Sequence, residues 1–289
     1  MITTGWRAPI ADLARYLARA DEVILPSHLA GSAGPLTIDP ERKLRVGVDL
    51  GTAYLVLVVL DEDGTPLAGE WQFAEVARDG LVVDFAGAVE RLRGMKARVE
   101  RRIGRELTHA ASGYPAGVPP VEVRATAHVV QAAGMECSGL LAEPVAANNV
   151  LQLRDGAIVA VGGGTTGIAV LQDGQVTYTA DEATGGTHFS LVIAGSQNIS
   201  FEEAEALKIT ISEQPRLLPL VRPVMEKVAN IIVRHTRDRP VESVTLVGGG
   251  SAFYGMAEAV QAYSGIPTHA VSRPIFVTPL GLALHDVAQ

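Results

Sequence analysis

The sequence predicts a two-lobed α/β protein, and three observations lead to this fold class. Residues 46–64, VGVDLGTAYLVLVVLDEDG, and residues 158–174, IVAVGGGTTGIAVLQDG, share a β-rich run, glycine and threonine, a second β-rich run and an Asp-Gly turn. Segments of helical periodicity follow each hairpin, as in an α/β layer. The length of 289 residues suits one large domain or two small ones. The duplicated hairpin therefore indicates a two-lobed clamp around a phosphate chain.

Composition excludes several classes of partner. The chain is 47% hydrophobic and carries a formal net charge of −8, which argues against DNA or RNA because phosphate backbones need clustered Lys and Arg. The one cysteine, Cys137, allows no internal disulfide, fits a reducing cytosol and is expected to be inert core. No apolar run reaches the roughly 18–20 residues of a membrane helix, and no secretory signal pattern is present. We expect a cytoplasmic protein without nucleic-acid or membrane partners.

Three regions are expected along the chain. Residues 1–43 form an N-terminal extension and linker, residues 44–150 the first lobe, and residues 151–289 the second lobe. Apolar residues between Ile10 and Leu17 recur at helical spacing, which predicts an amphipathic helix in the extension. Two interpretations of that extension stay open: an ordered cap on its own domain, and a docking segment for a partner.

In the first lobe, strands 46–50 and 54–60 precede an amphipathic helix over 84–103. THAASGYP is expected to form a strand closed by Pro115, and VEVRATAHVVQAAGM and EPVAANNVLQL to form helices.

In the second lobe, the hairpin spans 157–180 and Gly185-Gly186 opens a helix. ISFEEAEALK predicts a helix with Ser200 as its N-cap and Glu203 three residues on. Beyond it we expect a long amphipathic helix over 223–238, a strand in VESVTLVGGG and a helix in SAFYGMAEAVQAYSG. In PIFVTPLGLALHDV we expect a short strand or extended piece followed by a helix.

The glycine cluster 162–167 satisfies G-x-G-x-x-G, but its context does not fit a dinucleotide fingerprint. That fingerprint needs a helix after the glycines, whereas IAVLQDGQVTY predicts a strand and a turn. Glycines admit a phosphate close to the backbone, successive amides form an anion site, and Thr52 and Thr165 can add hydroxyl donors. A single hairpin of this kind would be read as structural; its repetition favours phosphate binding.

Three further features each have two interpretations. Gly248-Gly249-Gly250-Ser251 follows strand 243–247 and precedes a helix, which fits either a nucleotide site or common scaffolding. Glu205 and Lys208 lie three residues apart on one helix face. They fit either a solvated ion pair or a pair that binds a ribose. Glu143, before Pro144, is either a capping residue or a carboxylate that positions an attacking water.

These residues, in this order, resemble the actin-like ATPase superfamily, which includes heat-shock chaperones and MreB- and FtsA-type proteins. VGVDLGT and VAVGGGTTGIAVL resemble its two phosphate motifs, EPVAA its connecting helix, AEALK its ribose element and LVGGGSA its adenosine motif. The resemblance covers about residues 44–286. It implies two ribonuclease-H-like lobes with a central nucleotide cleft.

Within the superfamily, GVDLGT, ARDGLVVDF, DEATGG and ISFEEAEALK resemble the EutJ-type family, a chaperone-like group of ethanolamine utilisation. The small size leaves no room for a peptide-binding domain like that of heat-shock chaperones. The resemblance implies ATP or ADP with Mg²⁺ as ligands. It also implies a cytoplasmic setting beside bacterial microcompartments, with ethanolamine-utilisation enzymes or shell proteins as partners.

The resemblance also implies roles for individual residues. Asp49 would bind Mg²⁺ through water and take part in catalysis, and Glu143 would lie nearest to the hydrolytic water. The implied nucleotide contacts are Gly51, Thr52, Gly163, Gly164 and Thr165 at the phosphates, Glu205 and Lys208 at the ribose, and Gly249, Gly250 and Ser251 near the adenosine.

The chain departs from the superfamily pattern at three positions. Ala160 stands where the second phosphate motif usually begins with Asp, and Gly167 where heat-shock chaperones have another Asp. Because Mg²⁺ needs carboxylates to fix its waters, and loss of a catalytic electrostatic group costs on the order of 10²–10³ in rate, we predict nucleotide binding with slow or absent hydrolysis. Tyr54 is expected to crowd the phosphates.

Three functions remain in competition: a weak chaperone-like ATPase, a scaffold or adaptor that binds microcompartment proteins without turnover, and a filament-forming protein. Ala160 favours the second over the first. The lack of a Lys- and Arg-rich amphipathic membrane helix argues against MreB- or FtsA-like behaviour.

Overall fold

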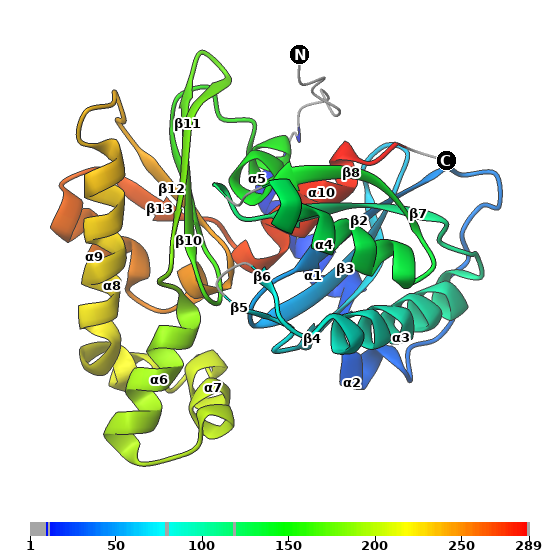
Figure 1. Cartoon of the computed structure of the whole chain (residues 1–289), viewed down its shortest axis with the longest axis horizontal. Helices are drawn as coiled ribbons and strands as arrows, with labels where there is room; N and C mark the ends of the chain where they lie inside the picture. Colours follow the sequence, from blue (N-terminus) through cyan, green and yellow to red (C-terminus); the bar gives the residue numbers. More distant parts are fainter. Residues whose placement is uncertain (1–9, 11, 79–80, 118–119, 288–289) are drawn as a thin grey trace. The chain divides into compact units, whose positions relative to one another are not determined.

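The computed structural model describes residues 10, 12–78, 81–117 and 120–287, which divide by packing into two compact units (Figure 1). Unit 1 comprises Met1–Gln152 and Phe276–Gln289, and unit 2 comprises Leu153–Ile275. Among the described residues, no helix combines the length and apolar character needed to cross a membrane.

Unit 1 is built on a six-stranded mixed sheet of order β1-β4-β3-β2-β7-β8. β2, β3 and β4 are antiparallel neighbours, whereas β7 and β8 run parallel to β2. The strands are β1 (Ile24–Pro26), β2 (Leu44–Leu50), β3 (Tyr54–Asp61), β4 (Pro66–Phe73), β7 (His109–Tyr114) and β8 (Glu136–Ala142), with the short pair β5 (Ala77–Arg78) and β6 (Leu81–Val82) beside them. The helices are α1 (Leu13–Val23), α2 (Ser27–Ala30), α3 (Phe85–Ile103), α4 (Pro120–Ala132), α5 (Glu143–Leu151) and α10 (Val277–His285).

Residues 12–30 form an ordered cap on unit 1. Asp12 caps α1 by accepting a hydrogen bond from the Arg15 amide, and α1 buries Leu17. β1 then pairs in parallel with the edge strand β4, which places Ile24 opposite Gly69. Of the two interpretations left open by the sequence, the structure shows the cap.

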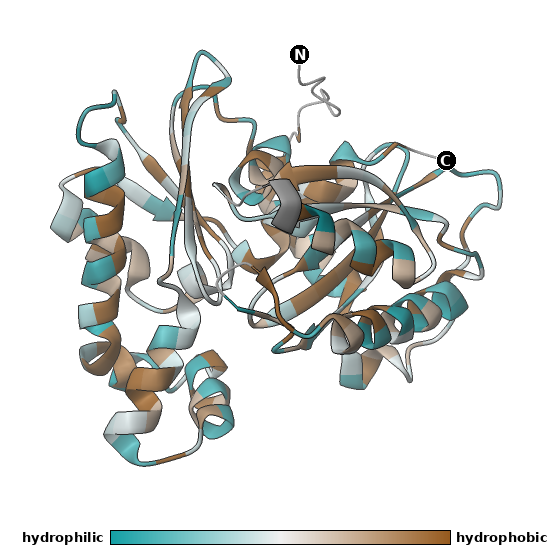
Figure 2. Cartoon of the chain, viewed as in Figure 1, coloured by the Kyte–Doolittle hydropathy of each residue, from teal (hydrophilic) through white to brown (hydrophobic). Residues whose placement is uncertain are grey.

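The two faces of the first sheet are covered differently. Val46 and Val48 of β2 face an apolar core that α3 completes, and Figure 2 shows the hydrophilic residues of α3 turned away from it. On the other face α10 lies so close to β2 that a Cβ on Gly47 would come within 2.4 Å of the Pro279 carbonyl oxygen. α10 also crosses α5 in backbone contact at Gly281, where a Cβ would lie 1.8 Å from the Ala146 oxygen.

This packing explains why the C-terminal segment belongs to unit 1. The sequence places residues 151–289 in one lobe, but residues 276–287 pack with unit 1 because α10 covers β2 and α5. The segment PIFVTPLGLALHDV contains no strand: a short 3-10 turn at Pro274–Phe276 leads directly into α10.

Unit 2 repeats the sheet of unit 1 without the extra edge strand. Its order is β11-β10-β9-β12-β13, with the same antiparallel and parallel pairings. The strands are β9 (Gly156–Val161), β10 (Thr166–Gln172), β11 (Gln175–Glu182), β12 (Val244–Val247) and β13 (Thr268–Ala270). The helices are α6 (Gly186–Gln197), α7 (Phe201–Ile209), α8 (Gln214–Thr236) and α9 (Met256–Ser264).

Helix α8 begins earlier than its sequence predicts. The sequence predicts a start at residue 223, yet the helix begins at Gln214 and runs through Pro219 and Pro223. Both prolines are exposed, while Leu217, Val221 and Met225 are buried at helical spacing. The missing amides therefore lie on the solvent side, where water can satisfy the freed carbonyls, and burial of the apolar stripe outweighs their loss.

Candidate functional site

The duplicated hairpins fold into the same backbone turn. In unit 1 the Gly51 amide donates to the Tyr54 carbonyl oxygen at 3.0 Å, and in unit 2 the Gly162 amide donates to the Thr165 oxygen at 2.9 Å. Gly51 and Gly162 therefore occupy equivalent positions in the two hairpins. We call residues 51–54 the first corner and residues 162–165 the second corner.

Asp49 precedes the first corner on β2, where it pairs with Val56 of β3. It lies on the face opposite Val48 and is half-buried. Burial raises the pKa of its carboxyl from 3.8 to about 7. Gly51 and Thr52 are half-buried beside it.

Glu143 is brought to the same sheet edge by β8 and α5. It is the first residue of α5, with Pro144 next, at the end where the helix dipole favours a carboxylate. A Cβ on Gly113 of β7 would lie 3.4 Å from its Cγ. Because Gly47 pairs with Ala111, Gly113 shares the face of Asp49. The structure thus brings Asp49 and Glu143 to one edge and one face of the sheet in unit 1.

The Tyr54 ring lies against other aromatic rings. Its centroid is 5.4 Å from that of Trp71 and 5.7 Å from that of Phe73, both in edge-to-face geometry, and both partners belong to β4. This aromatic cluster fixes the direction of the Tyr54 side chain. Crowding of the phosphates by Tyr54 stays a prediction.

The second corner carries no carboxylate at the matching positions. Ala160 of β9 pairs with Gly167 of β10, as Asp49 pairs with Val56 in unit 1. Thr165 is 7% exposed, Gly164 is buried and Gly163 is half-buried.

Two further glycine turns pack directly against the second corner. A Cβ on Gly185 would lie 2.5 Å from the Gly163 oxygen, and one on Gly248 would lie 2.5 Å from the Val161 oxygen. At Gly250 a Cβ would lie 2.7 Å from Val161 Cγ1. These glycines therefore allow three stretches of backbone to approach more closely than any side chain would permit.

The start of α6 is hydrogen-bonded to the second corner. The Gly186 amide donates to the Gly162 oxygen at 2.8 Å, and the amide and hydroxyl of Thr187 each donate to the Gly163 oxygen at 2.8 Å. From the sequence, Gly185-Gly186 was expected only to open a helix, and Thr187 was missed. The signal that could have found them is the DEATGG segment, where paired glycines precede threonine.

Glu205 and Lys208 form a buried pair in contact with the same backbone. Lys208 Nζ lies 2.6 Å from Glu205 Oε2 and 3.2 Å from the Gly186 oxygen, with side chains only 11% and 7% exposed for Lys208 and Glu205. Ser190 of α6 donates to the same carboxylate at 2.7 Å. Burial lowers the pKa of the Lys208 ammonium. The solvated-pair interpretation is therefore wrong; α7 turns this pair inward.

The adenosine-motif residues lie beside this pair, because a Cβ on Gly186 would be 3.6 Å from both Lys208 Nζ and Gly250 Cα. Gly249 is exposed, whereas the hydroxyl of buried Ser251 donates to the Val247 oxygen at 2.7 Å. The glycines form a 3-10 turn, Gly249–Ala252, and do not open helix α9, which begins at Met256. The expected helix N-terminus is thus replaced by a turn.

Among the described residues, no group of three or more His, Cys, Asp or Glu side chains could hold a metal ion. Asp49 alone fits a Mg²⁺ ion carried by a nucleotide, since Mg²⁺ keeps several waters and takes one or two carboxylates together with phosphate oxygens. The donor set therefore fits a nucleotide-borne ion and does not form a protein-only metal site.

Comparison with known proteins matches this architecture. Residues 110–277 match the family model of the type IV pilus assembly protein PilM. MreB5 of Spiroplasma citri bound to AMPPNP superposes with a TM-score of 0.68 at 17% identity, covering 84% of this chain and 95% of that one. At that identity the likeness shows the fold alone, which is the fold of the actin-like ATPases, as the sequence predicts.

Two relatives are much more similar. The crystal structure of ethanolamine utilization protein EutJ from Carboxydothermus hydrogenoformans has a TM-score of 0.86 and 43% identity, covering 94% of this chain and 98% of that one. Ethanolamine utilization protein EutJ of Escherichia coli (strain K12) is 43% identical over 244 residues, which are 84% of this chain and 86% of that protein. The chain therefore belongs to the EutJ family of ethanolamine utilization proteins.

Proposed function

We propose that unit 2 binds an adenine nucleotide. The observation that carries the proposal is that the second corner, the glycine turns at 185–186 and 248–250, and the buried Glu205–Lys208 pair adjoin one another within one unit. Gly163, Gly164 and Thr165 would face the phosphates, Glu205 and Lys208 the ribose, and Gly249, Gly250 and Ser251 the adenosine. The actin-like protein MreB5 is bound to AMPPNP in its structure, which supports the choice of ligand class.

Unit 1 carries its own set of groups, which we propose to act on nucleotide phosphates. Gly51 and Thr52 are proposed to donate to phosphate oxygens through the first corner, and Asp49 to hold Mg²⁺ through water. Bound Mg²⁺ would neutralise phosphate charge. Glu143 would orient the attacking water as the carboxylate nearest to it. Support for this pair of roles comes from the shared edge and face of Asp49 and Glu143.

Hydrolysis is proposed to be slow or absent. Ala160 and Gly167 pair with each other beside the second corner, and neither can fix a metal-bound water. With Asp49 as the only carboxylate at the two matching strand positions, nucleotide would act mainly as a bound effector.

The biological role we propose is that of a chaperone-like protein of ethanolamine utilisation. It would act in the cytoplasm beside the bacterial microcompartment, on pathway enzymes or shell proteins, with nucleotide setting its binding state. A scaffold that binds those proteins without turnover is the second candidate, because Ala160 removes a carboxylate at the second corner.

Calorimetric titration with ATP and ADP, with and without Mg²⁺, tests the nucleotide site in the wild type and in Ala160→Asp. We expect the wild type to bind with little phosphate release, and Ala160→Asp to raise turnover. Asp49→Ala should abolish any steady release. Absence of binding in both proteins would overturn the nucleotide site. Fast wild-type turnover would overturn slow hydrolysis, and concentration-dependent light scattering would indicate filament formation.

A further inference from the structure

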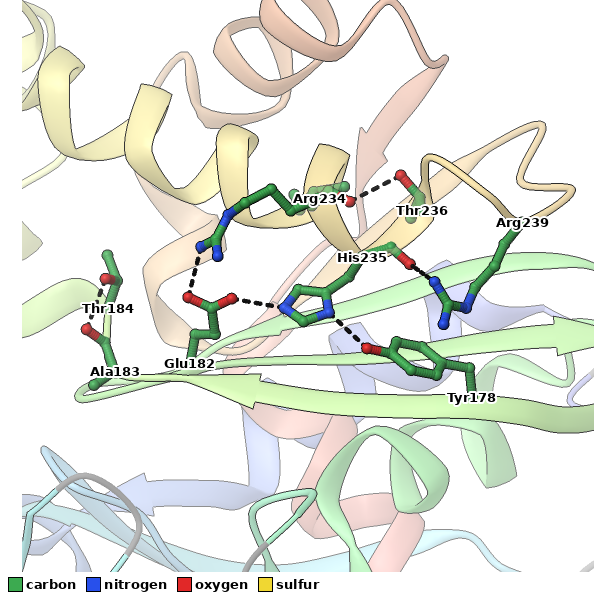
Figure 3. Close-up of polar contacts among 9 residues, drawn as sticks. Tyr178, Glu182, Ala183, Thr184, Arg234, His235, Thr236 and Arg239 are labelled. Carbon is green, nitrogen blue, oxygen red and sulfur yellow. Dashed lines mark hydrogen bonds and ion pairs between the residues drawn. The ribbon is translucent and has the colours of Figure 1, made fainter.

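A polar cluster in unit 2 lies outside the residues assigned so far. It joins the end of the edge strand β11 to the C-terminal end of α8 through side chains (Figure 3). Glu182 of β11 accepts from both sides: its Oε1 lies 2.6 Å from His235 Nε2, and its Oε2 lies 2.7 Å from Arg234 Nη2. These hydrogen bonds and the ion pair with Arg234 lower the pKa of Glu182, although partial burial opposes the shift.

His235 is held from its other nitrogen as well. The hydroxyl of Tyr178 lies 2.7 Å from His235 Nδ1, so the neutral tautomer with its proton on Nε2 satisfies both contacts. Arg239 closes the cluster, with its guanidinium 3.5 Å from the centroid of the Tyr178 ring and its Nη1 donating to the His235 carbonyl oxygen at 2.8 Å. His235 is therefore fixed in one orientation toward Glu182.

Glu182 is connected to the second corner through a few residues. It pairs with Thr166, the residue directly after the corner. Two residues beyond the end of β11, the Thr184 amide donates to the Glu182 oxygen at 2.8 Å, and the buried Thr166 hydroxyl donates to the Thr184 oxygen at 2.6 Å. Gly185 and Gly186 follow at once and pack on the corner.

We propose that the Glu182–His235 contact is a positioning element for the phosphate-binding turn. By holding the end of β11 against α8, it keeps the Gly185-Gly186 turn on Gly162 and Gly163, although neither Glu182 nor His235 is among the residues proposed to contact the nucleotide. An edge strand has hydrogen-bonded neighbours on one side only, so side-chain contacts decide how often its end opens. The effect on nucleotide affinity rests on the proposed function, whereas the effect on the turn does not.

Hydrogen exchange of individual amides in the nucleotide-free protein tests the positioning directly. His235→Phe removes both ring contacts, and we expect the Gly186 and Thr187 amides to exchange about tenfold faster while the β9 and β12 amides stay unchanged. His235→Gln retains a donor that can reach Glu182, so it should restore most of the protection. Tyr178→Phe, which removes only the Nδ1 partner, should give about a twofold to threefold effect and serves if His235→Phe does not fold.

The matched control is Glu226→Gln on the same helix. Glu226 pairs with Arg222 at 3.1 Å, with side chains 54% and 43% exposed for Arg222 and Glu226. It should leave exchange unchanged. In the same variants we expect ATP affinity to fall about threefold to tenfold for His235→Phe and to recover in His235→Gln.

Unchanged Gly186 and Thr187 exchange in His235→Phe would overturn the proposal, as would equal acceleration throughout unit 2, which would indicate loss of global stability only. If the wild type binds no ATP, the proposed function fails, and the exchange data still decide whether Glu182–His235 positions the turn.

Discussion

The first and second corners share one backbone turn and differ in their surroundings. Each is closed by a glycine amide that donates to the carbonyl three residues on, at 3.0 Å in unit 1 and 2.9 Å in unit 2. The first corner follows a strand that carries Asp49, whereas the second follows Ala160 and is packed against two further glycine turns. The turn is therefore a scaffold used twice, and its neighbours give each copy its own chemistry.

The largest expected effect concerns the glycine turn that only the second corner has. Gly248 adopts φ 83° and ψ 155°, a region open essentially to glycine, and a Cβ there would lie 2.5 Å from the Val161 oxygen. We expect Gly248→Ala to lower the free energy of unfolding by about 3 kcal/mol or more and to abolish nucleotide binding, as measured by urea unfolding and calorimetry.

Gly195→Ala is the control for Gly248→Ala. Gly195 lies inside α6, and nothing would approach its Cβ within 4 Å, so the substitution should stabilise unit 2 by about 0.5–1 kcal/mol. Equal destabilisation by both substitutions would contradict the packed-backbone account.

The next prediction distinguishes a structural role of the buried Glu205–Lys208 pair from a role in nucleotide binding. Lys208→Met leaves the Glu205 carboxylate buried without its cation, which should cost about 2–3 kcal/mol of unfolding free energy. Adding Glu205→Gln removes the charge as well, so the double variant should regain much of that stability while nucleotide binding stays lost. Recovery of binding in the double variant would show that the pair has only a structural role.

The next prediction concerns how the free energy of unfolding depends on pH, because Asp49 can titrate and Ala160 at the equivalent strand position cannot. Burial raises the pKa of Asp49 from 3.8 to about 7, so between these values the folded state holds a proton that the unfolded state has released. Stability from this group is thus full below pH 3.8, declines as pH rises toward about 7, and is then level. Asp49→Asn should match the wild type near pH 4 and exceed it by about 2 kcal/mol at pH 8, which is about half of the full value of such a shift because solvent screens the half-buried carboxyl.

Ala160→Asp sharpens this test, because it places a carboxyl at the equivalent, 5% exposed position of unit 2. Its unfolding free energy should decline more steeply with rising pH than that of the wild type. Parallel curves for wild type and Asp49→Asn would contradict the raised pKa.

Features that depend on neighbouring residues could be predicted from the sequence. Features that depend on packing between distant segments could not. The corners, the Ser200–Glu203 capping box and the start of α5 at Glu143 follow from neighbouring residues, and the structure has them where the sequence places them. The burial of Glu205 and Lys208 depends on α6, which presents Ser190 and the Gly186 oxygen to them. That contact joins two helices, so residue spacing within α7 could not decide between a solvated and a buried pair.

The position of the C-terminal helix also depends on packing between segments that are distant in the sequence. α10 follows unit 2 in sequence but packs on β2 and α5 of unit 1, where Gly47 and Gly281 permit backbone contact. An apolar helix can pack against many partners, so its sequence predicts burial and leaves the partner undetermined.

The smallest expected effect compares the equivalent glycines of the two corners. Neither has positive φ, so only packing separates them. A Cβ on Gly51 would lie 2.7 Å from the Tyr54 oxygen, within its own turn, whereas at Gly162 the nearest atom, the Thr165 oxygen, is 3.4 Å away. Gly51→Ala should therefore cost about 1–2 kcal/mol of unfolding free energy, and Gly162→Ala less than about 1 kcal/mol, in parallel urea titrations. Equal costs would mean that the first corner is no tighter than the second, and that the two turns differ only in the residues around them.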